Sequence, residues 1–524
     1  MHAGAEVKRA PGIDLSHHLS DLSKARQTSP LKGLQKYLGH PNLINLAGGL
    51  PHPDYFPYSR VSADALVPSS FATSRESSLS WLWNLFSGDK STSLTVPRYP
   101  AKDGDINLAQ ALQYGLARGM PQIQDFIRRF TAEVYQPAYD NWATLINSGN
   151  TDGWCRAALT LCNPGEGIFA AEWTYPSAKA TVIPLGVRMV PLPMDIQGIR
   201  SDKFREILAT WDDKSRNMSR PHVLYTIPIG QNPTGGTMSA PRKQEIYNIC
   251  VEFDIIIVED DPYYFLQHGQ YLPKASRGKS KEIQNDKWYS TLEPSYLAFD
   301  VQGRVIRLDS FSKVIAPGCR LGWFTCNPLF AERLERQGET SLQAPCGFSQ
   351  ALVTSLLLNW KDEGYTRWLR GLQAQYISRR DFFVDCLLDT FHFTPVTVAD
   401  EKSLWDGGVI YQAFREKSGN RSPVLSFVPP TSGMFVWLKV HFETHPLYEF
   451  HGQEALETKL WLKLAESGVL FGPGVMFSAS EPEDTTAIND GHMRVSFSNE
   501  EFDKMKTAVE IFKSTLDHFY DEKR

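Results

Sequence analysis

Apolar residues in the middle of the chain gather in short continuous runs, separated by longer stretches with helical spacing. The runs cover residues 143–146, 167–170, 187–192, 222–227, 255–258, 305–308 and 322–326. Several of them lack the apolar–polar alternation of a half-exposed strand, as expected for a sheet that helices cover on both faces. The repeated strand–helix order from about residue 105 therefore predicts an α/β fold with a mostly parallel sheet.

The pattern changes after about residue 346. Helical spacing runs through 349–360 and 365–391, a polar insertion follows near 396–422, and strand-like pieces occur at 433–438, 468–471 and 492–497 before a closing helix at 505–519. This order predicts a smaller α+β domain. We expect three parts: an N-terminal arm with an inserted loop (1–98), partly packing with the small domain; a large ligand-binding domain (99–345); and the small C-terminal domain (346–524).

Composition gives no support to several classes of function. A length of 524 residues fits two or more domains, and a formal charge of −5 gives no electrostatic reason to expect nucleic acid or an anionic membrane. Seven cysteines without regular spacing indicate free thiols in a reducing compartment. The sequence contains neither a CxxC nor an HExxH pattern, so no metal is expected, and it shows no bilayer-spanning apolar run or targeting signal. A soluble cytoplasmic protein is the expectation.

Polar side chains follow the ends of several predicted strands. Gly149, Asn150 and Thr151 come after one strand and open a helix, which is a ready anion site of backbone N–H groups. Asn232 and Lys313 come after two others. In parallel sheets, ligands bind beyond the carboxyl ends of the strands, so we expect these residues to lie together.

The residues around Lys313 favour one chemistry. A lysine at the end of a buried strand, flanked by Ser310 and Ser312 and followed by Arg320, suits a Schiff base with the aldehyde of pyridoxal 5′-phosphate (PLP). The serines and the arginine would hold the phosphate. A surface lysine after a strand is the plain alternative for this stretch taken alone.

The remaining strand-end residues match the other needs of PLP. Asp261 would keep the pyridine nitrogen protonated, so that the ring can act as an electron sink. Asn232 and Tyr264 would donate to the ring oxygen, and Tyr175 would stack on the ring. Each residue alone has an ordinary structural explanation, but the complementary set at successive strand ends favours the cofactor.

Six motifs occur in a familiar order. They are Leu-Ala-Gly-Gly-Leu-Pro at 46–51, Ala-Leu-Gln-Tyr-Gly at 111–115, Gln-Asn-Pro-Thr-Gly at 231–235, Glu-Asp-Asp-Pro-Tyr-Tyr-Phe at 259–265, Ser-Phe-Ser-Lys at 310–313 and Met-Arg-Val-Ser-Phe at 493–497. From about residue 46 to 497 the chain resembles the fold-type I PLP-dependent aminotransferases. It is most similar to the fungal aromatic amino acid aminotransferases and the related kynurenine/2-aminoadipate aminotransferases.

The resemblance implies further roles. Lys313 is then the catalytic Schiff-base lysine, its pKa lowered by burial near cations. Arg494 clamps the substrate α-carboxylate, with Gly49, Asn232 and Phe435 beside the substrate. The cofactor-binding residues are then Asn150, Thr151, Tyr175, Asn232, Asp261, Tyr264, Ser310, Ser312, Arg320 and Tyr114. The last of these reaches the phosphate of the neighbouring subunit, which implies a homodimer with shared active sites. One departure is the loop Gly-Asn-Thr-Asp-Gly at 149–153, where relatives often have Ser-Gln in place of Asn-Thr.

The implied reaction is transamination of phenylalanine, tyrosine or tryptophan with a 2-oxo acid such as 2-oxoglutarate, in ping-pong order. Two other donors of the same subgroup, 2-aminoadipate and kynurenine, stay open, as does another PLP reaction such as a lyase or decarboxylase. A transcription regulator on this fold would need a helix-turn-helix segment of about sixty residues before residue 46. The residues there lack that pattern.

Overall fold

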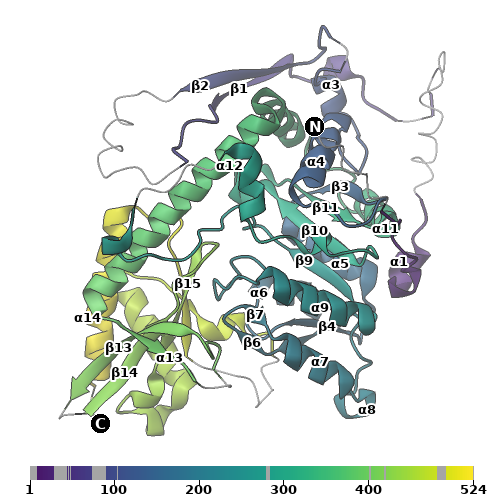
Figure 1. Ribbon diagram of the computed structural model, residues 1–524. Helices are drawn as coiled ribbons and strands as arrows, with labels where there is room; N and C mark the ends of the chain where they lie inside the picture. The colour runs from purple at the N-terminus through teal and green to yellow at the C-terminus, as the bar shows by residue number, and fades with distance from the viewer. Residues whose placement is uncertain are drawn as a thin grey trace, which may run out of the picture.

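The computed structural model describes residues 9–28, 44, 46–47, 49–73, 90–102, 104–278, 284–399, 403–417, 420–480 and 491–522. Its larger sheet has the strand order β3-β11-β10-β9-β8-β4-β5 (Figure 1). β11 runs antiparallel to β3 and β10, and the pairings among β10, β9, β8, β4 and β5 are parallel. The predicted mostly parallel sheet is confirmed. Its strands are β3 (Ala143–Asn147), β4 (Gly167–Ala171), β5 (Arg188–Leu192), β8 (Val223–Thr226), β9 (Ile256–Asp260), β10 (Val305–Ser310) and β11 (Gly322–Cys326).

Helices cover both faces of this sheet, as the continuous apolar runs predict. Alternate residues of one strand enter different cores: Ile306 and Leu308 pack on one side, and Val305 packs on the other. The helices that pack with Val305 are α4 (Pro121–Val134), α7 (Ser201–Ala209) and α9 (Ala240–Glu252). Those that pack with Ile306 are α5 (Asn150–Leu161), α6 (Pro176–Val182) and α11 (Pro328–Glu339).

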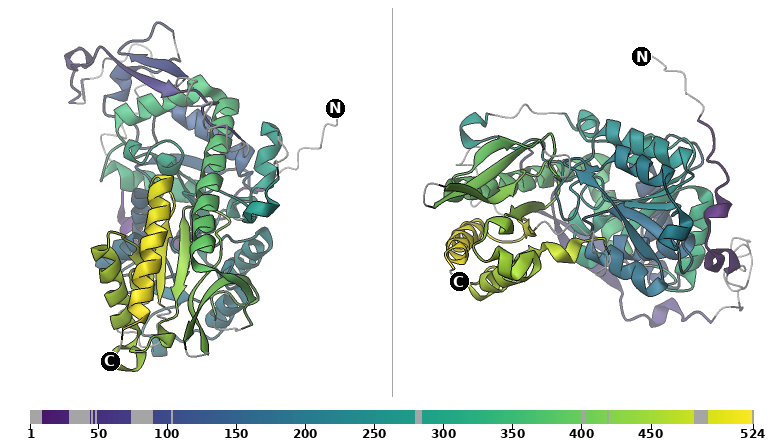
Figure 2. Two further views of the ribbon diagram at one scale, coloured as in Figure 1. Left: turned by 90° about the vertical axis from the view of Figure 1, so that its left-hand side faces the viewer. Right: turned by 90° about the horizontal axis from the view of Figure 1, so that it is seen from below.

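A second, antiparallel sheet forms the smaller unit, in the order β12-β13-β14-β15-β17-β16. Its strands are β12 (Thr394–Thr397), β13 (Val409–Lys417), β14 (Asn420–Phe427), β15 (Phe435–Val440), β16 (Gly472–Pro473) and β17 (His492–Ser496). α13 (Tyr448–Glu466), α14 (Phe502–Tyr520) and the C-terminal part of α12 (Gly347–Phe391) pack on it around a shared apolar core. Figure 2 shows α14 beside α12. This arrangement confirms the expected α+β domain.

Two strand expectations were wrong. Residues 468–471 form no strand, and the short β16 begins only at Gly472. The expected polar insertion at 396–422 contains β13 and the start of β14, and Ala413 of β13 is buried in the small-domain core together with Leu425 and Phe427 of β14. The residues around the hairpin turn are polar, because Arg415, Glu416 and Lys417 end β13 and Asn420 and Arg421 begin β14, which explains why the sequence pattern resembles an insertion.

The described N-terminal residues lie on the larger unit. Leu15 and Leu19 join the core beside α5 and α11, and Ser20 N–H donates to Thr160 O at 2.9 Å. The right-hand view of Figure 2 shows α1 (Asp21–Ala25) on the opposite side of the molecule from the small sheet. Of the expected insertion at 69–98, residues 74–89 lie outside the described residues. β2 (Ser91–Pro97) pairs with β1 (Arg60–Leu66), and this hairpin lies on α12.

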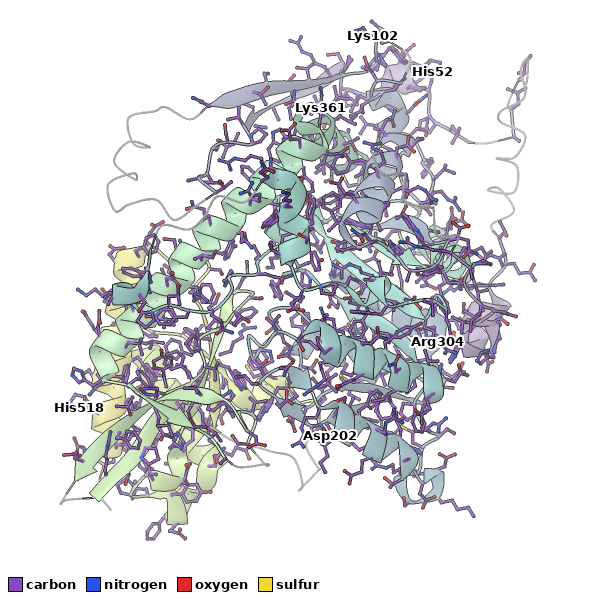
Figure 3. The ribbon with its side chains drawn as sticks, viewed as in Figure 1. His52, Lys102, Asp202, Arg304, Lys361 and His518 are labelled. Atoms are coloured by element: carbon purple, nitrogen blue, oxygen red, sulfur yellow. The ribbon has the colours of Figure 1, made fainter. Side chains whose placement is uncertain are left out.

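α12 belongs to both units. Its N-terminal half contacts α3 (Leu108–Ala111) and α4, and the helix also packs along α14 of the small domain. The backbone is non-helical at Lys361, where φ is 58°, so two helices meet there end to end (Figure 3). The division of the chain into 1–98, 99–345 and 346–524 therefore stays a prediction, because α12, which follows residue 346, packs on both units.

A buried ion cluster joins β9 and β10 on the α4 side of the large sheet. Arg307 is fully buried, and its guanidinium lies 3.1 Å from Glu259 Oε1, 3.1 Å from Asp261 Oδ2 and 2.9 Å from Asp309 Oδ1. The ring of Tyr135 covers the guanidinium at 3.9 Å from its centroid. The guanidinium thus contacts three carboxylates that have no access to water, and the buried Lys243 adds a second positive charge near Glu259 and Asp261.

We expect Arg307→Met to destabilise the fold by about 3–5 kcal/mol, since it removes the only guanidinium that contacts these three buried carboxylates among the described residues. The matched control is Arg205→Ala, which removes an ion pair with Glu252 in which both side chains are about half exposed, at 47% and 50%. Such pairs contribute about 0–1 kcal/mol. Urea denaturation followed by circular dichroism measures both. Equal midpoints for the two variants would show that Arg307 is not required for stability.

Candidate active site

The residues that follow the parallel strands surround one cavity of about 460 Å³, a size that suits a small-molecule ligand. It lies at the carboxyl edge of the large sheet and is completed by residues of the small domain. Most of the sequence-predicted residues line it: Asn150, Thr151, Tyr175, Asn232, Ser310, Ser312, Lys313, Arg320, Phe435 and Arg494. The convergence arises because β3, β8, β9 and β10 point the same way and end at the same edge.

Lys313 lies at the carboxyl edge of the large sheet. It ends the 3-10 turn Phe311–Lys313 directly after β10, and its side chain enters the cavity. Burial lowers the pKa of the Lys313 amine, and the nearby cations Arg320 and Arg494 lower it further. The expected depression of this pKa is confirmed. A lysine amine with a lowered pKa is neutral more often at physiological pH, which makes it a better nucleophile and base.

Donors for an anion gather at one end of the cavity. Arg320 Nη1 donates to Ser312 Oγ at 3.3 Å, and Ser310 Oγ donates to Ser312 Oγ at 2.8 Å. Gly149 precedes α5 with a φ of 94°, and a Cβ there would lie 2.5 Å from Arg320 Nη2. Only glycine therefore lets the guanidinium approach the start of the helix, where N–H groups and the helix dipole favour negative charge.

The Asn150 side chain has a different task from the one expected. Its Nδ2 donates to Asp260 Oδ1 at 2.7 Å and to Leu308 O at 3.1 Å, so the amide is turned away from the anion end. The side-chain amide therefore serves Asp260, and the assignment of Asn150 as a phosphate contact, which its backbone N–H at the start of α5 can still provide, stays a prediction. The physical reason is the neighbouring carboxylate, since a buried acid needs donors and Asn150 is within reach.

The acid of the cavity is Asp260 and not Asp261. Asp260 lines the cavity, whereas Asp261 points to the opposite face of the sheet and pairs with Arg307. The same one-residue shift applies to the tyrosines, because Tyr263 lines the cavity and Tyr264 packs on Arg307 at 4.8 Å. Successive residues at the end of a strand face opposite sides, so an error of one position reverses the side.

Two hydrogen bonds fix the Asp260 carboxylate. Tyr225 OH donates to Oδ2 at 2.6 Å, and Asn150 donates to Oδ1. Burial raises the pKa of Asp260, while the two donors act in the opposite direction. A cation placed beside Asp260 in the cavity would add to the effect of the donors and favour the ionised carboxylate.

Arg494 projects into the cavity from β17 of the small sheet. Its Nη1 donates to Asn232 Oδ1 at 2.8 Å, and its guanidinium lies between the rings of Phe435 and Phe477, 4.5 and 4.7 Å from their centroids. Burial lowers the Arg494 pKa. The two rings restrict the plane of the guanidinium and leave its edge for a carboxylate.

A close backbone contact keeps the two sides of the cavity together. Gly230 has a φ of 55°, and a Cβ at this position would lie 2.6 Å from Gly433 Cα. Gly230 begins the loop that carries Asn232, and Gly433 precedes the small-domain strand that carries Phe435. Glycine at both positions therefore allows the two loops to touch.

Besides Asp261 and Tyr264, two further predicted residues do not line this cavity. Gly49 is exposed, and a Cβ added to it would meet no atom within 4 Å, while Tyr114 is 65% exposed. Tyr114 lies instead along a separate hollow with Pro51, whose carbonyl accepts a hydrogen bond from Gln113. Their assignments as substrate and phosphate contacts stay predictions, and for Tyr114 the expected contact is with a second subunit.

Several lining residues were missed by the sequence analysis. The alternation of side chains along a strand could have identified some of them. Ser496 and Ser498 follow Arg494 at intervals of two residues and line the cavity with it. Tyr225, on the strand beside β9, pairs in register with Val258, two residues before Asp260. The missed lining residues that enter the argument below are Trp154, Tyr225, Ile227, Asp260, Tyr263, Met434, Ser496 and Ser498.

Glu457 supports the wall behind Arg494. Its side chain is buried in α13, and its Oε1 accepts the backbone N–H of Val475 at 3.1 Å, in the short turn Gly474–Phe477. The second oxygen, Oε2, is buried without a partner among the described residues. Burial raises the Glu457 pKa to about 7. This acid therefore anchors the turn that places Phe477 against Arg494.

This chain is similar in sequence and fold to several known proteins. The family model "Aminotransferase class I and II" matches residues 92–403. An aromatic amino acid aminotransferase of Schizosaccharomyces pombe is 35% identical, over 96% of this chain and 98% of its own. An L-tyrosine:2-oxoglutarate aminotransferase of Tapinella panuoides is 30% identical, over 98% and 97%. The crystal structure of aminotransferase Aro8 from Candida albicans superposes with a TM-score of 0.83 at 35% identity, covering 98% of this chain and 100% of that one.

We expect Glu457→Gln to change how stability depends on pH. The carboxyl has a folded-state pKa of about 7 against an ordinary value of 4.5, so the folded state binds the proton more tightly. Its contribution is fully present below the unfolded-state pKa and is lost as pH rises through about 7, by up to about 3 kcal/mol. The variant removes this loss and should gain stability relative to the parent between pH 5 and pH 8.

Thermal and urea denaturation at the two pH values measure this difference. Glu466→Gln is the matched control, because Glu466 lies on the same helix with its side chain exposed and does not act on the Glu457 pKa. The same pH response in both variants would contradict the assignment of a raised pKa to Glu457.

Proposed function

The chain belongs to the class I and II aminotransferases, and we propose that it transfers the amino group of an aromatic amino acid to a 2-oxo acid such as 2-oxoglutarate. The observation that carries the proposal is the arrangement around Lys313. A half-buried lysine stands between an anion-binding end with Arg320, a buried carboxylate of Asp260 and a second arginine, Arg494. When bound there, PLP supplies an electron sink that weakens the bonds at the amino-acid Cα.

The residues of the cavity fit this cofactor. Arg320, Ser310, Ser312, Thr151 and the start of α5 would hold its phosphate, at the end where Gly149 leaves room for the guanidinium. Asp260 would pair with the pyridine nitrogen, replacing the expected Asp261. Tyr263 with Asn232 would donate to the ring oxygen, replacing Tyr264, and Tyr175 would stack on the ring.

Two side chains would act on the substrate. Arg494 binds the α-carboxylate, and its hydrogen bond to Asn232 together with the flanking rings of Phe435 and Phe477 fixes its orientation beforehand. The Lys313 amine, with its lowered pKa, would act as the general base that takes the proton from the substrate Cα. In the second half of the reaction, with the 2-oxo acid, it would return a proton to Cα.

The walls of the cavity favour an aromatic side chain. Its cations among the described lining residues are Lys313, Arg320 and Arg494, and each has a role above. The other large lining side chains are aromatic or apolar: Trp154, Tyr175, Ile227, Tyr263, Met434 and Phe435. The names of the Schizosaccharomyces and Tapinella relatives support the same substrate class.

Neutral donors remain for a second carboxylate. The hydroxyls of Ser496 and Ser498 line the cavity 2.9 Å apart and could donate hydrogen bonds to the distal carboxylate of 2-oxoglutarate. The same donors would serve 2-aminoadipate, so this amino acid is the first alternative donor, with kynurenine as the second. A lyase reaction on the same cofactor is the third alternative, because it would use the same cofactor-binding residues.

The assembly and location follow the family. We expect a homodimer in which the exposed Tyr114 of each subunit reaches the phosphate held by the other. None of the described helices is long and apolar enough to cross a membrane. A cytoplasmic location stays the prediction from the sequence.

Single-turnover absorbance tests the reaction and the substrate class. We expect phenylalanine, tyrosine and tryptophan to convert the PLP-loaded protein to its pyridoxamine form faster than kynurenine or 2-aminoadipate do. Lys313→Ala should abolish the conversion, whereas Lys203→Ala, at a surface position paired with Glu206, should not. Bound PLP that no amino acid converts would remove the transaminase proposal and favour the lyase. Fastest conversion by 2-aminoadipate would overturn the aromatic preference.

A pair of neighbouring variants tests which aspartate serves the ring nitrogen. We expect Asp260→Asn to slow conversion by at least about 100-fold, as the loss of one active-site electrostatic group does. Asp261→Asn should reduce stability through the Arg307 cluster and leave the rate of the folded protein within about 10-fold. Rates are measured by single turnover, and stability by urea denaturation. The reverse pattern of rates would restore Asp261 as the cofactor partner.

A further inference from the structure

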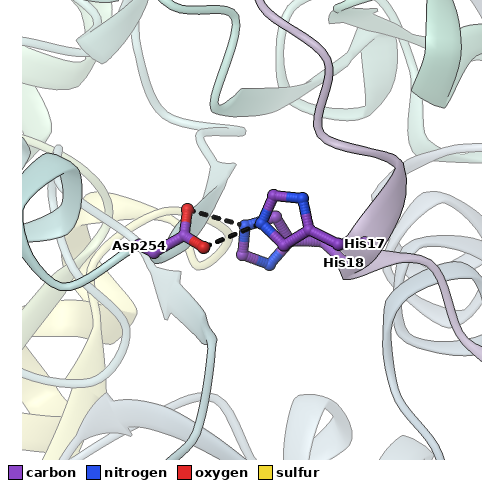
Figure 4. Close-up of side chains that lie close together, drawn as sticks. All are labelled: His17, His18 and Asp254. Carbon is purple, nitrogen blue, oxygen red and sulfur yellow. Dashed lines mark hydrogen bonds and ion pairs between the residues drawn. The ribbon is translucent and has the colours of Figure 1, made fainter.

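Two adjacent histidines and a distant aspartate meet at the opposite end of β9 from the cavity. His17 Nε2 lies 2.7 Å from Asp254 Oδ2, and His18 Nε2 lies 3.1 Å from Asp254 Oδ1. Figure 4 shows both imidazoles beside the carboxylate, and one ligand atom from each residue can be chosen so that all lie within 4.8 Å of one another. The histidines belong to the N-terminal turn Ser16–His18, and Asp254 lies in the turn between α9 and β9.

We propose that His17, His18 and Asp254 form a binding site for a divalent transition-metal ion, with Zn²⁺ as the preferred ion. Two imidazoles and a carboxylate are ligands that suit Zn²⁺ better than Mg²⁺ or Ca²⁺, which prefer all-oxygen sites. Ligand atoms around a tetrahedral zinc ion lie about 3.3 Å from each other. His17 Nε2 lies 2.7 Å from Asp254 Oδ2, and His18 Nε2 lies 3.1 Å from the other oxygen, Oδ1. One ligand atom from each of the three residues lies within 4.8 Å of the others, so small movements would bring the set to that spacing.

Hydrogen bonds behind the cluster suit a bound metal. His18 Nδ1 lies 3.0 Å from His222 Nδ1, and His222 Nε2 lies 3.5 Å from Glu166 Oε2. A metal on His18 Nε2 requires the proton of this ring to be on Nδ1, from which it is donated to His222. The His222 proton is then on Nε2 and faces the carboxylate of Glu166. With the protons placed in this way, each donor in the series from His18 through His222 to Glu166 faces an acceptor. Hydrogen-bonded histidine ligands of this kind are common around metal sites.

The carboxylate ligand is also oriented. Arg304 Nη1 donates to Asp254 Oδ1 at 2.7 Å, which leaves Oδ2 directed at His17. Metal-bound carboxylates are commonly hydrogen-bonded in this way. The competing explanation is a plain ion-pair cluster of Asp254 with the two histidines and Arg304, and the experiment below separates the two.

A metal here would fasten the N-terminal segment to the large domain. His18 and Asp254 are separated by 236 positions, and the segment between them includes much of the large sheet. Closing so long a loop gives a cross-link a large effect on the unfolded chain. Because Asp254 precedes β9 and Asp260 ends it, the effect should be on stability and not on catalysis. The three residues do not form a metal-binding motif with a short, regular spacing in the sequence, which explains why the sequence patterns predicted no metal.

The test uses the full-length, PLP-loaded protein after treatment with a chelator. Titration with ZnCl₂ in competition with a zinc-binding dye should show one tight site per chain, and the melting temperature should rise with zinc. Co²⁺ in place of Zn²⁺ should give the intense visible bands of a four-coordinate ion. His17→Ala should weaken zinc binding by at least about 100-fold, since even outer-shell changes cost 10–100-fold.

The controls keep the test decisive. His17 has a side chain 58% exposed, so its removal should not affect folding, and Asp254→Asn retains a residue type that tolerates the φ of 56° at this turn. His518→Ala removes an exposed histidine on α14, at the far side of the molecule from Arg304 (Figure 3), and should leave binding unchanged. His222→Ala should weaken binding by about 10–100-fold. Absence of a tight site in the parent protein, or parent-like affinity in both His17→Ala and Asp254→Asn, would overturn the proposal.

Discussion

The buried guanidinium of Arg307 is the constraint on which the arrangement of β9 and β10 depends. Glu259, Asp261 and Asp309 all need it, because none of these carboxylates reaches water. Ion pairs of this kind add little net stability, since desolvation offsets most of the attraction. Their effect is to exclude other arrangements: a shift of either strand by one residue would place these charges among the apolar side chains of α5 and α6.

The same constraint decides which groups reach the cavity. With Glu259, Asp261, Arg307 and Asp309 committed to one face, the alternate residues Asp260 and Ser310 must lie on the other, where the cavity is. Tyr225 and Asn150 then hold Asp260 in place by two short hydrogen bonds. The chemistry at the front of the sheet is thus positioned by charges at the back, although no atom of Arg307 lines the cavity.

The sequence predicted what local patterns determine. Continuous apolar runs located the strands of the large sheet, and the position of Lys313 after one of them placed it at the edge where ligands bind. The choice between Asp260 and Asp261 failed because both follow the same run, and only the partner of each carboxylate distinguishes them. The hairpin β13–β14 was not predicted, because the polar and charged residues around its turn hide the apolar positions of its strands. The meeting of His17 and His18 with Asp254 depends on contacts across more than 200 positions, which no local pattern contains.

The cavity exists only where the two domains touch, and this has a consequence for Arg494. Its guanidinium comes from the small sheet, but its hydrogen-bond partner Asn232 belongs to the large domain. The loops behind these residues meet at Gly230 and Gly433, where a single added methyl group would separate them. A movement of the small domain would therefore displace Arg494 from Asn232, while Lys313, Asp260 and Arg320 stay together on the large sheet. The cofactor-binding half of the site is thus built into one domain, and the substrate-binding half depends on how closely the second domain packs against it.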